Sequence, residues 1–186
     1  RFRTGIRKRP AEGPVFIGTD AVAGDNISDR KHHGGADQVV YAYSQDDYEW
    51  WSTQLGRELA PGTFGENLTI EGLPSDMNVG DRLLIGDVLL EATAPRIPCS
   101  TLAAQMQDSA FGMAFRRAER PGIYFRVLNE GEVSAGDAVV GDGDEALFVT
   151  EGSGRLECLY GVLPFRRHDY LVIPKSTPYR LVFDDG

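Results

Sequence analysis

Cys99 is the residue best placed for chemistry, in the stretch APRIPCSTL between a predicted strand and a predicted helix. A thiol near a helix N-terminus faces the positive end of the helix dipole and unpaired backbone N–H groups, and both favour the thiolate. Arg96, three residues earlier, adds positive charge that acts in the same direction. A thiolate ligates soft metals and attacks electrophiles. The alternative interpretation is a small buried hydrophobe, which is the usual role of a free cysteine.

His32 and His33 are adjacent in KHHGGADQVVYAY, directly before an apolar β-like segment. An imidazole can ligate a metal, donate to an oxyanion or occupy a polar turn. Neighbouring side chains on an extended chain point in opposite directions, so two adjacent histidines rarely bind one ion. Gly34 and Gly35 would let backbone N–H groups approach a bound anion. The residues alone leave both a ligand-contacting loop and a structural turn open.

Gly65, Glu66 and Asn67 form a polar turn in GTFGENLTIEG, just before a predicted strand. Such a turn can offer a backbone N–H group, a carboxylate and an amide to one pocket, although glycine and asparagine also occur in turns for conformational reasons alone. The sequence contains no Walker or dinucleotide GxGxxG pattern, no zinc-finger spacing and no nucleophile elbow. A pairing of Cys99 with one of the two adjacent histidines remains open.

Composition and charge exclude several classes of protein. The formal charge of −9 over 186 residues argues against a general nucleic-acid binder, which needs a basic surface. The first nine residues, RFRTGIRKR, include five Arg or Lys and form either an anion-binding rim or a solvated terminus. No apolar run approaches the roughly 20 residues that span a bilayer, so no membrane association is expected. Two cysteines suggest free thiols and a cytoplasmic location. Cys158 and His168 are interpreted as structural.

Short apolar segments separated by glycine and proline dominate the chain. They are rich in Val, Ile, Leu, Tyr and Phe and are bounded by turn residues, which is typical of strands. Gly86 and Asp87, at the centre of RLLIGDVLLEAT, predict a tight hairpin. The expected strands cover 39–43, 67–70, 82–93, 122–128, 138–140, 146–150, 155–161 and 169–174.

Two segments are predicted to be helical. The first covers 44–56, from an N-cap-like serine to a glycine, and places Tyr48, Trp51 and Leu55 on one apolar face. The second begins at 100 and contains a glycine, Gly112, near which it could break. Many strands with two helices predict a mainly β protein, a β-barrel with helices packed outside.

A change in composition indicates a domain boundary near Gly141. Glycine and acidic residues cluster in GEVSAGDAVVGDGDEA, after which a β-hairpin pattern resumes. We therefore expect one domain over 1–140 and a second segment over 141–186. The second segment is too short to be a stable independent domain without help.

Taken together, RTGIRKRPAEGPVFIG, DRKHHGGADQVVYAY, PGTFGENLTIEGL, VGDRLLIGDVLLEATAPRIPC and GEVSAGD resemble the MOSC family, closest to its stand-alone bacterial YiiM-like members. The resemblance covers residues 1 to about 140, and HHGG, FGEN and PRxPC in series form a specific set. It implies a MOSC-type β-barrel with a few flanking helices. It also implies binding of the molybdenum cofactor, a molybdopterin dithiolene that carries molybdenum.

The resemblance assigns roles to individual residues. It implies that Cys99 is the molybdenum or sulfur-carrying ligand and that Arg96 contacts the pterin phosphate through its planar donor fork. The loop Lys31–Gly35, with His32 and His33 as conjectured proton donors, is implied to line the cleft. The same holds for Gly65, Glu66 and Asn67. The cluster of Arg7, Lys8 and Arg9 is expected to assist in binding the anionic cofactor.

The resemblance also implies a reaction and its partners. YiiM-like members are linked to the reduction of N-hydroxylated bases such as 6-hydroxylaminopurine, with electrons supplied by a separate redox protein. A homodimer is compatible with this expectation. A first alternative is a non-catalytic carrier that holds the cofactor or a persulfide sulfur on Cys99. A second alternative is an interaction module in which Cys99 is an inert core residue.

The last segment departs from this family. Residues 142–186, above all DYLVIPKSTPYRL, resemble a fragment of the cupin-like N-terminal β-domain of homogentisate dioxygenase. The segment has no His-x-His pattern, and Tyr179 lies near where a metal-binding cupin often has histidine. We therefore expect a β-hairpin-rich cupin-like fragment without an iron site, joined either by fusion or as a divergent MOSC tail. Its strand edges would need the barrel or another chain to cover them.

Overall fold

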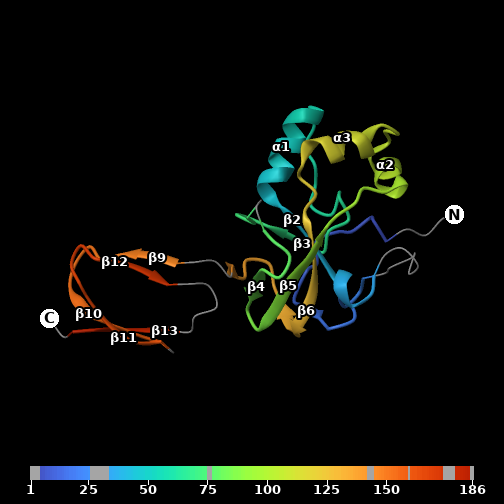
Figure 1. Ribbon diagram of the computed structural model, residues 1–186. Helices are drawn as coiled ribbons and strands as arrows, with labels where there is room; N and C mark the ends of the chain where they lie inside the picture. Colours follow the sequence, from blue (N-terminus) through green and yellow to red (C-terminus); the bar gives the residue numbers. More distant parts are fainter. Residues whose placement is uncertain are drawn as a thin grey trace. The chain divides into compact units, whose positions relative to one another are not determined.

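The structure is a computed structural model that describes residues 5–25, 34–74, 77–141, 145–158, 160–173 and 179–184. The chain divides into two compact units, Arg1–Val140 and Gly141–Gly186. The division falls where the composition of the sequence changes. Both units are built mainly from strands, and the helices belong to the first (Figure 1).

The first unit is a nearly closed β-barrel. Its six-stranded sheet has the order β3-β2-β6-β5-β4-β8 among the described residues. The pairs β2–β6, β6–β5 and β5–β4 are antiparallel, whereas β2 and β3 run parallel and are joined by a connection that contains a helix. A separate antiparallel pair, β1 with β7, adds to the barrel wall. The bounds are β1 (Val15–Ile17), β2 (Val40–Ser44), β3 (Leu68–Ile70), β4 (Arg82–Ile85), β5 (Val88–Pro95), β6 (Ile123–Asn129), β7 (Gly131–Val133) and β8 (Val139–Gly141).

The hairpin predicted at Gly86 is confirmed. Ile85 of β4 pairs with Val88 of β5, and Gly86 between them has φ 57°, a left-handed conformation that glycine adopts without strain. The strands β1 and β7 were not predicted. Each is three residues long, too short to show an alternating pattern.

The first predicted helix is confirmed as α1 (Gln45–Leu55). The hydroxyl of Ser44 accepts a hydrogen bond from the Asp46 N–H at 3.2 Å, and Gly56 ends the helix in the left-handed conformation. The predicted apolar face is correct for Tyr48 and Trp51, which are buried, and wrong for Leu55, which is 36% exposed. Leu55 lies in the last turn, beside the cap.

The second predicted helix is two helices, α2 (Ser100–Met106) and α3 (Phe111–Ala118). The expected break is confirmed, but it lies at 107–110, just before Gly112, and that glycine itself is inside α3. Gln107 closes α2 in a left-handed conformation, and the Asp108 side chain accepts a hydrogen bond from the Ala110 N–H at 2.8 Å. All three helices lie together on one side of the sheet (Figure 1). None of the helices in the described residues is long and apolar enough to cross a membrane.

Two hydrophobic clusters hold the first unit together. The barrel interior is aliphatic, with Val40, Leu90 and Phe125 at its centre. Between the barrel and the helices lies an aromatic cluster in which Phe64 and Tyr43 stack with ring centroids 4.5 Å apart. Phe64 is fully buried, so the FGEN turn is anchored in this cluster. The cluster consists of Ile6, Tyr41, Tyr43, Tyr48, Trp51, Leu59, Phe64, Leu102, Met106, Phe111 and Phe115.

The second unit is rich in β-hairpins, as predicted. Its described strands form two small sheets, ordered β11-β10-β13 and β12-β9. The bounds are β9 (Glu145–Phe148), β10 (Ser153–Cys158), β11 (Gly161–Arg166), β12 (Tyr170–Ile173) and β13 (Tyr179–Phe183). His168 lies in an exposed turn with φ 73°, and Cys158 is half-buried at the end of β10.

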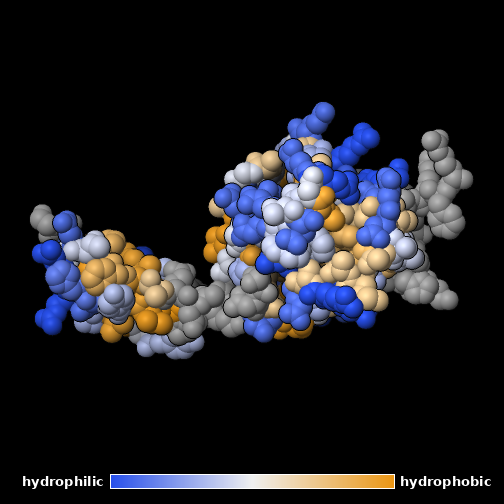
Figure 2. All heavy atoms as spheres, turned by 90° about the horizontal axis from the view of Figure 1, so that it is seen from above, coloured by the Kyte–Doolittle hydropathy of each residue, from blue (hydrophilic) through white to orange (hydrophobic). Residues whose placement is uncertain are grey.

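The core of the second unit is small. Among the described residues of this unit, the buried members of the core are Leu156, Phe165, Leu171 and Ile173. Large apolar side chains remain on the surface of this unit (Figure 2), among them Tyr160, Val162, Tyr170, Val172 and Phe183, each more than 60% exposed. The resemblance of this segment to a cupin fragment stays a prediction.

Candidate functional site

Cys99 lies between the end of β5 and the start of α2, as predicted. The helix α2 begins at Ser100, as expected, and Cys99 itself occupies the N-cap position with φ −119° and ψ 168°. Its side chain is half-buried and packs against the aromatic cluster. The thiol therefore lies at the border between the core and solvent, where a ligand can reach it.

The electrostatic surroundings of Cys99 favour the thiolate. Burial alone would raise the pKa of the thiol, but the backbone N–H groups of Leu102 and Thr101 and the guanidinium of Arg96 act in the opposite direction. Their combined effect outweighs burial, so the pKa of Cys99 lies below the ordinary value for a thiol. This is the property that metal ligation and nucleophilic attack require of a cysteine.

Arg96 is buried, with 8% of its surface exposed. Its Nη1 donates a hydrogen bond to the backbone oxygen of Phe64, and its guanidinium carbon lies 4.8 Å from the centroid of the Tyr41 ring. Its Nε has no hydrogen-bond partner among the described residues. Arg96 is thus held by the FGEN turn and by β2. Direct contact with a phosphate stays a prediction.

Two tyrosines beside Arg96 were not singled out from the sequence. Tyr41 and Tyr124 lie with ring centroids 5.0 Å apart. Burial raises the pKa of Tyr124, Arg96 opposes that shift, and Cys99 adds to it. The net direction is upward, so the hydroxyl remains protonated near neutral pH. No signal in the sequence distinguishes these tyrosines from core residues, because both lie in strands.

The turn that follows the HHGG loop contacts β5. Lys31, His32 and His33 lie outside the described residues. Gly34 and Gly35 have φ values of 100° and 85°, and they lead into η1 (Ala36–Gln38). The backbone oxygen of Asp37 in this turn lies 2.5 Å from the Thr93 hydroxyl, which is also 3.0 Å from the backbone oxygen of Tyr124. Thr93 precedes Cys99 by six residues, so the loop is fastened to the strand that leads to the thiol.

The FGEN turn is closely covered by the N-terminal segment. Gly65 has φ 79°, and a Cβ placed there would lie 2.8 Å from Cγ1 of Ile6. Gly62, three residues earlier, has φ 88°, and a Cβ there would lie 2.5 Å from the backbone oxygen of Lys8. Only glycine fits these two positions. The glycines in the turn thus serve close packing of the backbone.

Glu66 is buried, with 3% of its surface exposed. Its Oε1 accepts hydrogen bonds from the Tyr48 hydroxyl, from the Gly62 N–H at 2.6 Å and from the Thr69 hydroxyl at 3.0 Å. Its Oε2 is buried and has no hydrogen-bond partner among the described residues. One carboxylate oxygen therefore holds the turn together while the other has an unused capacity to accept.

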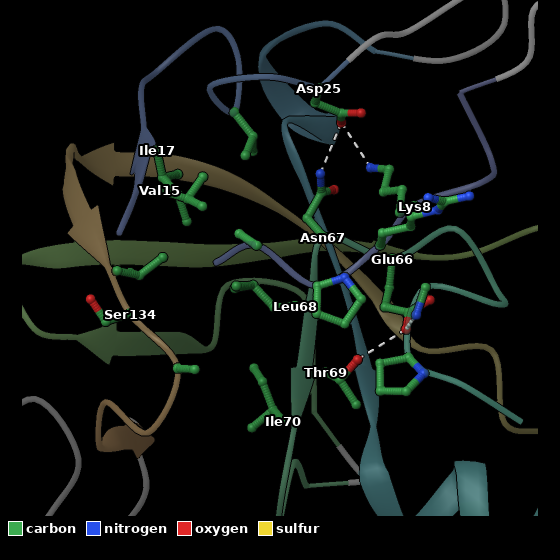
Figure 3. A pocket seen from close by; sticks show the side chains of 18 of the residues that line it. Lys8, Val15, Ile17, Asp25, Glu66, Asn67, Leu68, Thr69, Ile70 and Ser134 are labelled. Atoms are coloured by element: carbon green, nitrogen blue, oxygen red, sulfur yellow. Dashed lines mark hydrogen bonds and ion pairs between the residues drawn. The ribbon is translucent and has the colours of Figure 1, made fainter. Parts of the chain in front are cut away.

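Asn67 and Lys8 converge on one carboxylate (Figure 3). The Asn67 amide nitrogen and the Lys8 ammonium each lie 2.8 Å from Oδ2 of Asp25. The Asn67 amide oxygen accepts from the Tyr41 N–H at 3.0 Å, which ties the turn to β2. Burial lowers the pKa of Lys8, and Asp25 partly opposes that shift. Asp25 was missed in the sequence because it lies in a loop without a recognisable motif.

A pocket of about 1050 Å³ lies beside this network. Of the predicted residues, Arg7, Arg9, Glu66 and Asn67 line it, whereas Arg96 and Cys99 are not part of its described lining. Arg7 links the pocket lining to α2, because its Nε donates a hydrogen bond to Oε1 of Gln105 in that helix at 3.2 Å. The structure thus separates two groups of predicted site residues. Cys99 and Arg96 form one group, which we call the thiol corner, and Arg7, Arg9, Glu66 and Asn67 line the pocket.

Comparisons with known proteins identify relatives of the first unit. The uncharacterized protein YflK of Bacillus subtilis (strain 168) is 36% identical over 137 residues, 73% of this chain and 62% of YflK. A protein of Gibberella moniliformis named "Reductase" is 35% identical over 140 residues, 72% of this chain and 25% of that protein. Protein YiiM of Escherichia coli (strain K12) is 29% identical over 135 residues, 70% of this chain and 60% of YiiM. The chain spans less than two thirds of the length of each.

Solved structures agree with the fold. The crystal structure of YiiM from Geobacillus stearothermophilus matches with a TM-score of 0.65 at 34% identity, over 76% of this chain and 66% of that one. YiiM from Escherichia coli matches with a TM-score of 0.61 at 26% identity, over 74% of this chain and 65% of that one. The family model described as MOSC domain matches residues 29–140, more than half of the sequence. This match, together with the relatives above, establishes that the chain belongs to the MOSC domain family.

Proposed function

We propose that this protein is a MOSC-type oxidoreductase that binds the molybdenum cofactor and reduces N-hydroxylated compounds such as 6-hydroxylaminopurine. One observation carries the proposal: Cys99 is a half-buried thiol of lowered pKa, next to a buried arginine. Family membership and the fungal relative named "Reductase" support an oxidoreductase or cofactor-binding role.

The residues around Cys99 fit such a cofactor chemically. A thiolate is a soft donor, which suits a molybdenum centre better than a carboxylate would. The buried guanidinium of Arg96 stabilises the negative charge of the thiolate, and its Nε has no hydrogen-bond partner among the described residues. The exposed side chains of Arg7 and Arg9 provide positive charge at the pocket rim for an anionic cofactor. We assign Cys99 as the metal ligand and these arginines as anion contacts.

The reaction is a two-electron reduction. When bound, the molybdenum centre would supply the electron pair that breaks the N–O bond. An N-hydroxylamino group, two protons and two electrons give an amino group and one water, and a separate redox protein supplies the electrons. His32 or His33 would deliver a proton to the departing oxygen, because imidazole titrates near neutrality. The backbone N–H of Gly35 would contact the substrate, whereas that of Gly34 already donates to Oε1 of Gln38 at 3.3 Å. A homodimer and a cytoplasmic location remain part of the proposal.

Molybdenum and pterin content of the purified protein tests the cofactor claim. The full chain, a Cys99→Ser variant and a matched Cys158→Ser variant are expressed in a host that makes the cofactor. We expect near-stoichiometric molybdenum in the wild type and in Cys158→Ser, with a sharp fall in Cys99→Ser. Absence of molybdenum and pterin from all three proteins would remove the cofactor claim.

Turnover separates an enzyme from a carrier. With a chemical electron donor and 6-hydroxylaminopurine, an enzyme forms many equivalents of the amino product per bound molybdenum. A carrier of the cofactor or of persulfide sulfur forms at most one equivalent. Molybdenum content and product yield are measured on the same preparation of cofactor-loaded protein. The ratio of product to molybdenum then distinguishes an enzyme from a carrier.

A further inference from the structure

The two-stranded sheet of β9 and β12 is largely apolar on both of its faces. Leu171 and Ile173 face the core of the second unit, and each is 4% exposed. Tyr170 and Val172 alternate with them on the other face and are 72% and 68% exposed. Phe148, opposite Tyr170 in the register, extends this outer face, with the two ring centroids 4.7 Å apart. A sheet face in solvent is normally polar, so this outer face indicates a partner.

The edge of β12 that points away from β9 presents backbone groups without a strand partner among the described residues. The N–H of Val149, directly after β9, donates to the backbone oxygen of Asp169 at 2.9 Å. Backbone groups alternate in direction along an antiparallel pair, so those of Leu171 point to β9 and those of Tyr170 and Val172 point to the free edge. Such an edge is a template for another strand.

The other described edge strands of this unit carry residues that oppose pairing. β11 contains Pro164, which has no N–H to donate. β13 contains Arg180, whose Nε donates to Oε2 of Glu157 at 3.2 Å, and β9 begins with Glu145. β12, with the sequence YLVI, contains neither a charged residue nor a proline. It is therefore the edge that lacks the usual protection against strand pairing.

A second copy of the same chain fits this edge. An uncharged strand brings no like charges together when it pairs with itself. In an antiparallel pair with a two-fold axis at Leu171, Tyr170 of each copy lies opposite Val172 of the other, and the outward N–H and C=O groups of both copies are paired. An aromatic residue opposite a β-branched one is a favourable cross-strand pair. Two marginal two-stranded sheets would become one sheet of four strands.

We propose that β12 is a dimerisation strand, through which two copies of this chain pair antiparallel about a two-fold axis at Leu171. The short second unit gains a larger sheet from this pairing than it forms alone. The inference rests on the proposed function only in taking up the homodimer, and it requires neither molybdenum nor catalysis.

Sedimentation velocity of the full chain, made in a host that lacks the molybdenum cofactor, tests the proposal. We expect a species of twice the 20.4 kDa of one chain. Val172→Lys places a charge in the cross-strand pair and should weaken the dimer about 10-fold or more. Val162→Lys is the matched control, because Val162 lies in β11 of the same unit and is 63% exposed; it should leave the dimer unchanged.

Val172→Pro keeps the test decisive if the lysine variant does not fold. Proline removes the outward N–H of residue 172, which is not used in the pairing with β9, so the dimer should be lost while β9 and β12 stay paired. A wild type that keeps the mass of one chain up to about 100 µM would overturn the proposal. So would equal weakening by the two lysine variants, or a dimer that survives both substitutions of Val172.

The register of the pairing gives a positive test in a Cys99→Ser, Cys158→Ser background. Directly opposite residues of this kind have Cα atoms about 5.5 Å apart, within the range that a disulfide spans. Under mild oxidation, Tyr170→Cys mixed with Val172→Cys should form the mixed disulfide faster than either variant links to itself; equal rates would contradict the two-fold register. A chain that dimerises through β12 but never acquires molybdenum retains this inference and loses the proposed function, and a molybdenum-loaded monomer does the reverse.

Discussion

Gly62→Ala should destabilise the first unit, because the new methyl group would push the backbone at Lys8 away from the segment that leads into the FGEN turn. The new Cβ would lie 2.5 Å from the Lys8 oxygen and 2.8 Å from its carbonyl carbon, and backbone atoms cannot give way as a side chain can. An alanine held at φ 88° costs about 1–2 kcal/mol, and forced overpacking adds about 1–3 kcal/mol. The expected loss in the free energy of unfolding is therefore about 2–5 kcal/mol.

Gly72→Ala is the matched control. Gly72 also has a positive φ, 67°, but a Cβ there meets no atom within 4 Å. This variant should lose only the conformational part, about 1–2 kcal/mol. The difference between the two variants isolates the contact with Lys8.

Urea unfolding followed by tryptophan fluorescence gives both values. The chain has two tryptophans, Trp50 and Trp51, and both lie in α1, so the signal reports the first unit. Equal losses in the two variants, within about 0.5 kcal/mol, would refute the reasoning, because the contact would then contribute nothing. A larger loss in Gly72→Ala would refute it as well.

The surroundings of Cys99 yield two further predictions, and the FGEN turn yields a third. In a Cys158→Ser background, alkylation of Cys99 in the cofactor-free protein should reach half its maximal rate at a lower pH than N-acetylcysteine does, because the lowered pKa leaves more thiolate at a given pH. Arg96→Met should move that midpoint to higher pH, since the guanidinium charge is lost; a midpoint that does not move would show that the backbone N–H groups act alone. Tyr48→Phe should lower the free energy of unfolding by about 1–3 kcal/mol, because the buried Glu66 carboxylate loses the hydrogen bond from the tyrosine hydroxyl. Urea titration measures this free energy. An unchanged value would mean that another donor replaces the hydroxyl.

Local features of the sequence were sufficient where neighbouring residues decide the structure. The hairpin at Gly86 follows from a turn residue between two apolar runs, and α1 follows from its serine cap and its terminal glycine. The position of Cys99 between a strand and a helix was likewise readable, because proline and serine mark that junction. The break between α2 and α3 was located only approximately, since Gln107 gives no turn signal in the sequence and adopts its left-handed conformation nonetheless.

The series HHGG, FGEN and PRxPC determined the family of this protein from the sequence alone, and the match to the MOSC domain agrees. Tertiary structure decided which of these residues meet. It joined Arg96 to the Phe64 oxygen across 32 positions and brought Asp25 to Asn67 across 42. It also placed the two oxygens of Glu66 in different settings, one fully occupied and one without a partner among the described residues. Such pairings depend on how strands distant in the chain are arranged around a common core, and no local pattern of residues encodes that arrangement.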